Sequence, residues 1–507
     1  MKPATKQLTN TLGKVVTGIS GLDYIAFGGL PKDRTTLVVG TSGSSKTLLA
    51  IQFLVEGIRK GEHGVFVTFE ESPEDIMRNV SGFGWDLEQY VNEGKLAFVD
   101  ASPQLDHRDI EIGSYDLGAL VARLNYAVKK VQAQRLSVDS LGSIFGQLTA
   151  TEIVRRELHQ IFMKLKTLSV TSMVTAERTE EYGALARYGV EEFAADNVII
   201  LRNVLDSERR RRTLEILKFR GSDHCKGEYP FSITVEDGII VIPLGETRLE
   251  QKSSKQRASS GNDVLNEMSG GGYFRDSIVL LSGATGCGKT LLASTFVVAE
   301  QGPEERTLFF AYEESREQLT RNADGWGIDF KKLEQSGQLK IICNYPEFLS
   351  LEDHLLLIKK SIAEFKPTRI AVDSLSALER VASGKSFREF VIGLTSFIKN
   401  EQILGMFTVA TPDLLGSASV TDEHISTITD TIIMLRYVEM FGEVHRGIMV
   451  LKMRGSMHDK GIRQYQVDSQ GMHIGGQFHG ISGILSGNPV HVPQNDYDRI
   501  GTLFQEE

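Results

Sequence analysis

Hydrophobic and polar positions follow two alternating patterns along the chain. Short continuous apolar runs, such as residues 36–39 and 136–138, are separated by stretches in which apolar residues recur at helical spacing, as in 46–59. Buried strands that alternate with helices indicate an α/β fold with a mostly parallel sheet flanked by helices. Residues 197–204 and 213–219, joined by a polar turn, predict a hairpin at the edge of that sheet.

The whole pattern occurs twice. Lys289 follows Lys46 by 243 residues, and Asp373 follows Asp139 by 234 residues. Four blocks recur in the same order, which predicts duplication of a whole domain. They are GTSGSSKT (40–47) and GATGCGKT (283–290), VFVTFEES (65–72) and LFFAYEES (308–315), LSVDSL and IAVDSL around the two aspartates, and KFRGSDHCKG (218–227) and KMRGSMHDKG (452–461).

The repeat sets the predicted domain boundaries. The polar stretch EQKSSKQRASSGN is typical of an exposed linker between the two copies. The expected organisation is an N-terminal lead (1–16), a first domain (17–249), the linker (250–262), a second domain (263–487) and a C-terminal tail (488–507).

Composition and charge exclude several classes of protein. The chain has 507 residues, of which 41% are hydrophobic and 24% charged, so wholesale disorder and fibrous repeats are excluded. The formal net charge of −10 argues against binding nucleic acid or an anionic membrane through bulk charge. No stretch approaches the roughly 18 apolar residues of a membrane helix. Three scattered cysteines suit a reducing compartment, and we expect a cytoplasmic protein.

The two glycine-rich blocks have the pattern of a phosphate-binding loop. Glycines let successive backbone N–H groups surround phosphate oxygens, the lysine adds a positive charge, and the threonine hydroxyl binds Mg²⁺. Ser45 departs from this pattern, because its Cβ stands where the motif has a second glycine. The predicted nucleotide-binding residues are Gly40, Thr41, Ser42, Gly43, Ser44, Ser45, Lys46 and Thr47, and Gly283, Ala284, Thr285, Gly286, Cys287, Gly288, Lys289 and Thr290.

Acidic residues at strand ends complete the candidate chemistry. Asp139 and Asp373 end apolar strands, where a carboxylate can orient Mg²⁺ opposite the loop hydroxyl. The consecutive pairs Glu70-Glu71 and Glu313-Glu314 follow another strand, where a carboxylate can take the proton of an attacking water or hydroxyl group. The alternative is that the glutamates only favour a helix N-terminus, since a serine follows each pair and begins a capping motif.

Two further segments carry candidate chemistry, the edge hairpin and the region before it. Basic residues after the hairpin, in 218–224 and 452–458, could reach the terminal phosphate of a neighbouring subunit, or form a solvated basic edge. The arginine run 209–212 favours surface exposure or a subunit contact over DNA reading. Ser426 and Thr427 stand where the first copy has a glutamate and a phenylalanine, so the second copy alone offers hydroxyls that can accept a phosphoryl group, unless they are ordinary loop residues.

Together these blocks resemble the KaiC family of circadian-clock ATPases and autokinases, from about residue 17 to 487. The resemblance implies two RecA-like domains, CI and CII, in a double-ringed homohexamer that binds ATP and Mg²⁺. It implies slow ATP hydrolysis in CI, and autokinase and autophosphatase activity in CII. Competing hypotheses are a RecA-type DNA motor and a non-enzymatic scaffold held together by nucleotide.

The resemblance also implies roles for individual residues. Glu70 and Glu71 would be the catalytic pair of CI, and Glu313, beside Glu314, the general base of CII. Metal contacts would come from Thr47, Asp139, Thr290, Glu313 and Asp373, and the phosphoacceptors would be Ser426 and Thr427, with Thr421 as an auxiliary site. Trp326 would lie near the CII nucleotide. Contacts to the nucleotide of the adjacent protomer would come from Lys218, Phe219, Arg220, Ser222 and His224, and from Lys452, Met453, Arg454, Ser456, Met457, His458 and Lys460.

The resemblance has limits at the C-terminus. The tail NPVHVPQNDYDRIGTLFQEE does not follow the basic tail to which KaiA binds in clock-type members, so the resemblance does not extend to control by KaiA. The body of the first domain does follow the family, and a KaiB-like partner is expected there. Neither a nucleic acid nor a membrane is expected as a partner.

Overall fold

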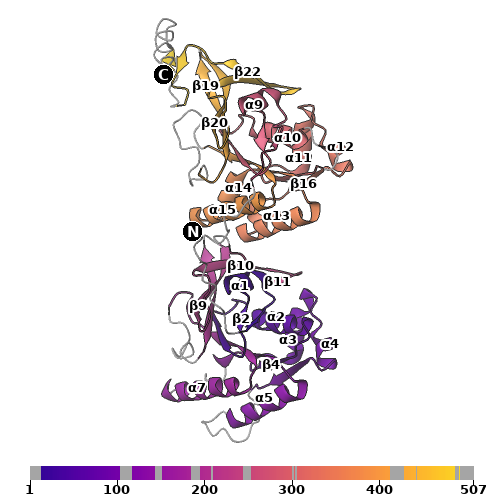
Figure 1. Cartoon of the computed structure of the whole chain (residues 1–507), viewed down its shortest axis with the longest axis vertical. Coiled ribbons are helices and arrows are strands. Elements are labelled where there is room, and N and C mark those ends of the chain that lie inside the picture. Colours follow the sequence, from indigo (N-terminus) through magenta and orange to yellow (C-terminus); the bar gives the residue numbers. More distant parts are fainter. Residues whose placement is uncertain are drawn as a thin grey trace, which may run out of the picture. The chain divides into compact units, whose positions relative to one another are not determined.

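The chain folds into two compact units, Met1–Pro243 and Leu244–Glu507 (Figure 1). The structure is a computed structural model. It describes residues 13–102, 117–142, 151–183, 195–206, 209–243, 253–299, 302, 305–411, 427–440, 442–485 and 490–491. Among these residues, no helix combines the length and the apolar character needed to cross a membrane.

The first unit contains a nine-stranded sheet in the order β11-β10-β9-β8-β3-β7-β6-β4-β5. The six strands from β8 to β5 are parallel, and β9, β10 and β11 continue the sheet in antiparallel fashion. Its strands, with the separate pair β1 and β2, are β1 (Lys14–Val15), β2 (Leu30–Pro31), β3 (Thr35–Gly40), β4 (Gly64–Thr68), β5 (Leu96–Asp100), β6 (Arg135–Asp139), β7 (Thr171–Glu177), β8 (Asn197–Asp206), β9 (Arg209–Phe219), β10 (Glu228–Thr234) and β11 (Gly238–Val241).

The second unit repeats this topology in the order β16-β15-β17-β18-β14-β19-β20-β21-β22. Again six strands are parallel and three are antiparallel. Its strands are β12 (Arg257–Ala258), β13 (Tyr273–Phe274), β14 (Ile278–Gly283), β15 (Thr307–Ala311), β16 (Leu339–Cys343), β17 (Arg369–Asp373), β18 (Leu404–Ala410), β19 (Thr431–Met440), β20 (Glu443–Met453), β21 (Arg463–Asp468), β22 (Gly471–Gln477), β23 (Ile481–Ser482) and β24 (Val490–His491).

Helices flank both sheets, and apolar side chains of helices and strands form the cores. In the first unit α2 packs its apolar residues, including Leu49 and Phe53, against the sheet, and a second core cluster lies under α5 and α7. The helices are α1 (Ser20–Ile25), α2 (Lys46–Arg59), α3 (Pro73–Val80), η1 (Ser81–Phe83), α4 (Leu87–Asn92), α5 (Leu117–Val131) and α7 (Thr151–Thr167), then α9 (Asp263–Met268), α10 (Lys289–Val298), α11 (Arg316–Asp324), α12 (Phe330–Gln335), η2 (Pro346–Phe348), α13 (Leu351–Phe365), α14 (Leu375–Glu379) and α15 (Gly384–Asn400).

The mostly parallel sheet flanked by helices is confirmed in both units. The sequence expectation is refined at the sheet edge, because the predicted hairpin is β8 and β9 but β10 and β11 lie outside it. Two short pairs add detail near the predicted boundaries. Residues 257–258, within the segment predicted as a linker, form β12 and pair with β13, and residues 490–491, within the predicted tail, pair with β23.

Candidate functional site

The phosphate-binding loop of the first unit joins the end of β3 to the start of α2. Gly40 is required, because an added Cβ would clash with the Ser44 hydroxyl. Ser45 adopts a left-handed backbone, with φ +73°, immediately before the first residue of α2. The chain therefore accepts the conformation that favours glycine despite the side chain. The backbone N–H groups at the start of α2 face the loop and form a site for anionic groups.

Lys46 is nine-tenths buried, and its side chain bonds to the backbone of this loop. Its Nζ donates hydrogen bonds to the carbonyl oxygens of Gly40 at 3.0 Å and Thr41 at 2.9 Å. Burial lowers the pKa of Lys46, while nearby carboxylates, Glu177 first and Asp139 next, oppose that shift. A phosphate group in the loop would give the ammonium the negative partner that burial makes it need.

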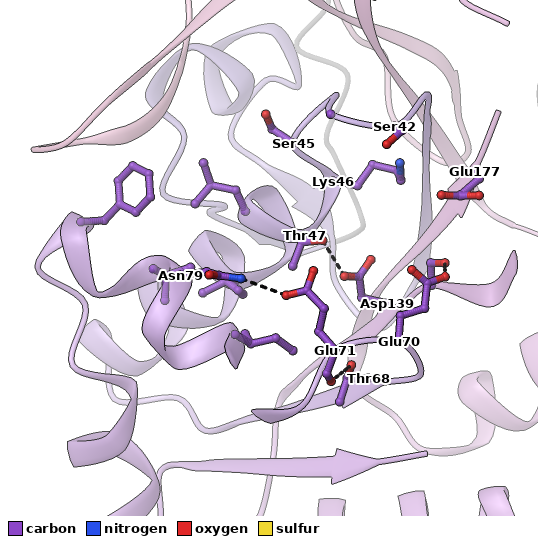
Figure 2. Close-up of a pocket in the computed structure, with 17 residues that line it drawn as sticks. Ser42, Ser45, Lys46, Thr47, Thr68, Glu70, Glu71, Asn79, Asp139 and Glu177 are labelled. Atoms are coloured by element: carbon purple, nitrogen blue, oxygen red, sulfur yellow. Dashed lines mark hydrogen bonds between the residues drawn. The ribbon is translucent and has the colours of Figure 1, made fainter. Parts of the chain in front are cut away.

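A cavity of about 380 Å³ opens beside the loop (Figure 2). It brings together side chains from the phosphate-binding loop, the glutamate pair and the end of β6, which the sequence predicted as one site. Its walls are Ser42, Gly43, Ser45, Lys46, Thr47, Leu48, Ile51, Thr68, Glu70, Glu71, Ile76, Asn79, Val80, Phe83, Asp139, Ser140 and Glu177.

The Thr47 hydroxyl and the Asp139 carboxylate face each other in this cavity. Thr47 Oγ1 donates to Asp139 Oδ2 at 2.6 Å (Figure 2). The Thr175 hydroxyl donates to the other carboxylate oxygen. Burial raises the pKa of Asp139, and the two hydroxyl hydrogen bonds only partly offset this effect. A buried carboxylate beside a hydroxyl is an oxygen-only donor set that a hard divalent cation would stabilise. The residues therefore fit Mg²⁺.

The two glutamates of the first unit are held by different partners. Ser140 Oγ donates to Glu70 Oε1 at 3.2 Å, and Asn79 Nδ2, on α3, donates to Glu71 Oε2 at 3.0 Å. The capping alternative is also present, since Ser72 Oγ accepts from the third residue of α3 at 3.1 Å. This cap does not use either glutamate side chain. Both carboxylates line the cavity.

The second unit builds the same loop with the glycine that the first unit lacks. Gly288 has φ +97°, and Lys289 Nζ donates to the carbonyl oxygens of Gly283 and Ala284, both at 2.9 Å. Cys287 is fully buried in this loop, and burial raises the pKa of its thiol.

The acidic groups of the second unit follow the same plan. Burial raises the pKa of Asp373, and the hydroxyls of Thr408 and Thr290 bind its carboxylate. Asn322 Nδ2 donates to Glu314 Oε2 at 3.0 Å, and burial raises the pKa of Glu314 as well.

Glu313 has a partner of a different kind. Arg380 Nη1 lies 3.4 Å from Glu313 Oε1, and both side chains of this ion pair are about half exposed to solvent. The Ser315 cap beside it is a complete capping box with Gln318. Ser315 therefore caps α11 together with Gln318, and this cap does not use the side chains of Glu313 and Glu314.

Sequence reasoning missed the two asparagines and the two threonines that hold these carboxylates. Asn322 follows Asn79 by 243 residues, so the repeat itself carried that signal. Thr175 and Thr408 lie within β7 and β18, and nothing in their local sequence marks them. Their position beside β6 and β17 depends on the strand order.

The basic residues at the ends of β9 and β20 lie away from the phosphate-binding loop of their own unit. β9 pairs with β8, and β20 pairs with β19, in antiparallel fashion. The segments 218–220 and 452–454 therefore lie beside the amino ends of the parallel strands β8 and β19. The loops follow β3 and β14 at the carboxyl end. Among the described residues, those in 218–224 do not line the cavity of the first unit.

Several of these residues have partners in their own unit. Lys218 Nζ donates to Ala195 O at 2.8 Å and Lys452 Nζ to Thr429 O at 3.1 Å. His224 is buried, with Nε2 at 2.9 Å from Ile216 O, and burial lowers its pKa. In contrast, the Met457 side chain is 90% exposed.

The predicted acceptor region lies at the same amino end. Arg454 Nη2 donates to Thr427 O at 2.6 Å, and the Thr427 side chain is exposed. Ser426 and Thr421 lie outside the described residues. Trp326 is partly buried and packs against the core of the second unit.

Comparison with known proteins decides the family. The family described as "ATPase: KaiC" matches residues 15–246 and again 258–478, which together make up most of the chain. The chain belongs to the KaiC family. It is 59% identical over 501 residues to a circadian clock protein KaiC3 from a Synechocystis species, covering 99% of both chains.

Other relatives are similar along almost their whole length. The chain is 56% identical to the circadian clock oscillator protein KaiC of Acaryochloris marina, covering 97% of this chain and 94% of the relative. It is 55% identical to that of Thermosynechococcus vestitus, covering 98% and 96%. Both units are therefore the duplicated RecA-like domains of a KaiC ATPase.

Proposed function

We propose that this protein is an ATP hydrolase and a serine/threonine autokinase whose two units use the same nucleotide chemistry on different attackers. In the first unit the attacker is water, and in the second it is the hydroxyl of Thr427, or of Ser426, of a neighbouring copy. The observation that carries the proposal is the separation of the acceptor edge from the phosphate-binding loop of the same unit.

The separation follows from the register of the central strands. β14 and β19 are parallel, with Val279 opposite Thr431, and the phosphate-binding loop follows Gly283 at the far end. Thr427 precedes β19, and a six-residue strand such as β14 spans roughly 17 Å. A γ-phosphate in the loop would therefore lie far from Thr427 of the same chain, so transfer within one chain is disfavoured.

Phosphoryl transfer from one copy to the next would bring Thr427 close to a γ-phosphate. One copy would present the amino end of its sheet, with Thr427, Lys452 and Arg454, to the phosphate-binding loop of the next. Such a head-to-tail contact uses two different surfaces and forms a ring when the rotation between copies closes. The contact is compatible with the homohexamer that the family resemblance implies. The hydrogen bond between Arg454 and Thr427 keeps the basic group and the acceptor segment together on one edge.

The proposed reaction is an in-line phosphoryl transfer. Glu313 takes the hydroxyl proton of Thr427 as the new bond from oxygen to the γ-phosphorus forms, and the bond to the bridging oxygen breaks to release ADP. Lys289 holds the phosphates, and Arg454 of the neighbour offsets the charge that develops. Thr290, Asp373 and Glu313 would hold Mg²⁺, which supplies charge neutralisation when bound.

The first unit lacks acceptor hydroxyls at the equivalent positions, which carry Glu192 and Phe193. With Glu70 or Glu71 as the base, water becomes the attacker and the products are ADP and phosphate. Thr47 and Asp139 would hold the metal ion.

We further propose a role in circadian or timer-type signalling, which the names of the relatives support. We also propose a KaiB-like partner on the first unit, which the family match across 15–246 supports.

The deciding experiment is intact-mass analysis of the purified protein after incubation with Mg²⁺–ATP, followed by peptide mapping. We expect one or two added phosphates in the peptide that contains Ser426 and Thr427, together with steady release of free phosphate. Stimulation of hydrolysis by DNA with no phosphoprotein would contradict the proposal in favour of a RecA-type motor. Bound ATP without turnover would favour a scaffold.

A further inference from the structure

Each unit has one basic side chain that closes the turn after its first helix. Lys14 and Arg257 are 243 residues apart, the same spacing as the two loop lysines. Each donates to two backbone carbonyl oxygens at equivalent positions of that turn. The distances are 2.9 Å to Ala26 and 3.2 Å to Gly29 for Lys14 Nζ, and 3.0 Å to Ser269 and 2.6 Å to Gly272 for Arg257 Nη1.

The arginine makes one contact that the lysine does not. Arg257 Nη2 donates to Ser456 Oγ at 2.6 Å, and Ser456 Oγ in turn donates to Met457 O at 3.0 Å. The serine hydroxyl is therefore fixed both as an acceptor and as a donor. A guanidinium can span three partners because its nitrogens form a rigid planar fork, whereas an ammonium is a single point. Lys14 Nζ instead lies 4.3 Å from the centre of the Phe219 ring.

The turn itself also differs between the units. Gly270 has φ +65°, and a Cβ there would lie 2.7 Å from Met457 O, so the turn lies directly against the backbone of the 455–457 loop. The first unit has Phe27 at this position, with φ +52° and a side chain 52% exposed. The close approach between turn and loop in the second unit thus depends on a glycine that the first unit lacks.

We propose that Arg257 is a positioning residue for the contact between copies in the second unit. By fixing Ser456 it sets the direction in which the exposed Met457 and the following His458 face the nucleotide of the neighbouring copy. In the first unit Lys14 closes the turn and lies over the Phe219 ring, without a hydrogen bond to the equivalent serine, Ser222. This inference rests on the proposed function and on the family resemblance, which implies that residues within 452–460 contact that nucleotide.

The test exchanges the two residues between the units. Arg257→Lys keeps the two bonds to the turn and loses the bond to Ser456. We expect the KM for ATP in phosphate incorporation to rise roughly three- to tenfold, with kcat changed less than about twofold. This is only part of what losing a hydrogen bond to a charged group costs, because Arg257 acts on the nucleotide through Ser456. Phosphate release by the first unit and the melting temperature should stay unchanged. Lys14→Arg is the matched control and should leave incorporation unchanged.

A double-mutant cycle separates positioning from general stability. Ser456→Ala should raise the same KM, and Arg257→Lys should add nothing further in that background. An unchanged KM in Arg257→Lys, additive effects in the double variant, or an equal loss in both reactions would each overturn the inference.

If the wild-type protein incorporates no phosphate, the proposed function fails instead. Arg257 is then tested by titrating a fluorescent ATP analogue into full-length protein carrying Lys46→Ala, which removes the loop lysine of the first unit. Arg257→Lys should weaken analogue binding roughly three- to tenfold, less than the full cost of a lost charged hydrogen bond because the effect passes through Ser456. Unchanged binding would overturn the inference.

Discussion

The two nucleotide sites share one scaffold and differ at its rim. In each unit a lysine closes the phosphate-binding loop, two threonine hydroxyls bind a buried aspartate, and an asparagine holds the second glutamate. The first glutamate, however, meets the Ser140 hydroxyl in the first unit and the Arg380 guanidinium in the second.

This difference teaches which parts of the site set the chemistry. The lysines of the phosphate-binding loops and the aspartates with their threonine partners are buried or partly buried and repeat in both units. The glutamates proposed as bases, Glu70 and Glu313, are exposed and have different partners. An ion pair that is half exposed, such as Glu313 with Arg380, is worth about 0–1 kcal/mol, so it leaves Glu313 free to move to a hydroxyl group.

The largest expected effect separates the two activities. Glu313→Gln should lower phosphate incorporation at least about 100-fold, because it removes the proposed base, while phosphate release by the first unit continues. Glu70→Gln and Glu71→Gln are the crossed controls and should lower release instead. Incorporation from γ-labelled ATP and release of free phosphate measure the two reactions, and undiminished labelling in Glu313→Gln would contradict the assignment of the base.

The next effect concerns the asparagines that hold the second glutamates. Asn322→Ala should lower phosphate incorporation about tenfold, because Glu314 loses the hydrogen bond that keeps it oriented and that lowers its pKa. Asn79→Ala should lower phosphate release by a similar factor and spare incorporation. Equal effects of either variant on both reactions would show that the asparagines act on folding rather than on their own sites.

A smaller effect distinguishes the two basic residues behind the turns. Burial lowers the pKa of Lys14 to about 8, against about 10.4 in an unfolded chain. The wild type should therefore be most stable relative to Lys14→Gln above pH 10.4 and should lose that advantage as the pH falls through 8. Melting temperatures between pH 7 and 10.5 measure this. The control, Arg257→Gln, should give a difference that does not vary with pH, because a guanidinium keeps its charge.

The smallest effect concerns the one departure within the first loop. Ser45 has a left-handed backbone, so Ser45→Gly should stabilise the first unit by up to about 1 kcal/mol. The reverse change, Gly288→Ser, should destabilise the second unit, since an added Cβ would lie 3.2 Å from the Met472 side chain. Chemical denaturation of the two variants checks the signs, and two changes of the same sign would refute this account of the loop.

Much of the fold and of the site could be predicted from the sequence. The phosphate-binding loops depend on local backbone geometry that only a few residue types allow, and α10 begins at Lys289 as the motif requires. Asp139 and Asp373 were predicted as site carboxylates, because an acidic residue at the end of an apolar strand is visible in the pattern. The strands β10 and β11 outside the hairpin were missed, since their pairing leaves no local signal.

The sequence by itself determined the duplication, the two loops and the difference in hydroxyl groups, because repetition and short motifs are properties of neighbouring residues. Only the tertiary structure decided which partner each glutamate has, and that Arg257 reaches Ser456, 199 residues away. It also placed the start of β19, which Thr427 precedes, and the phosphate-binding loop at opposite ends of one sheet, because that depends on the direction in which distant strands pair.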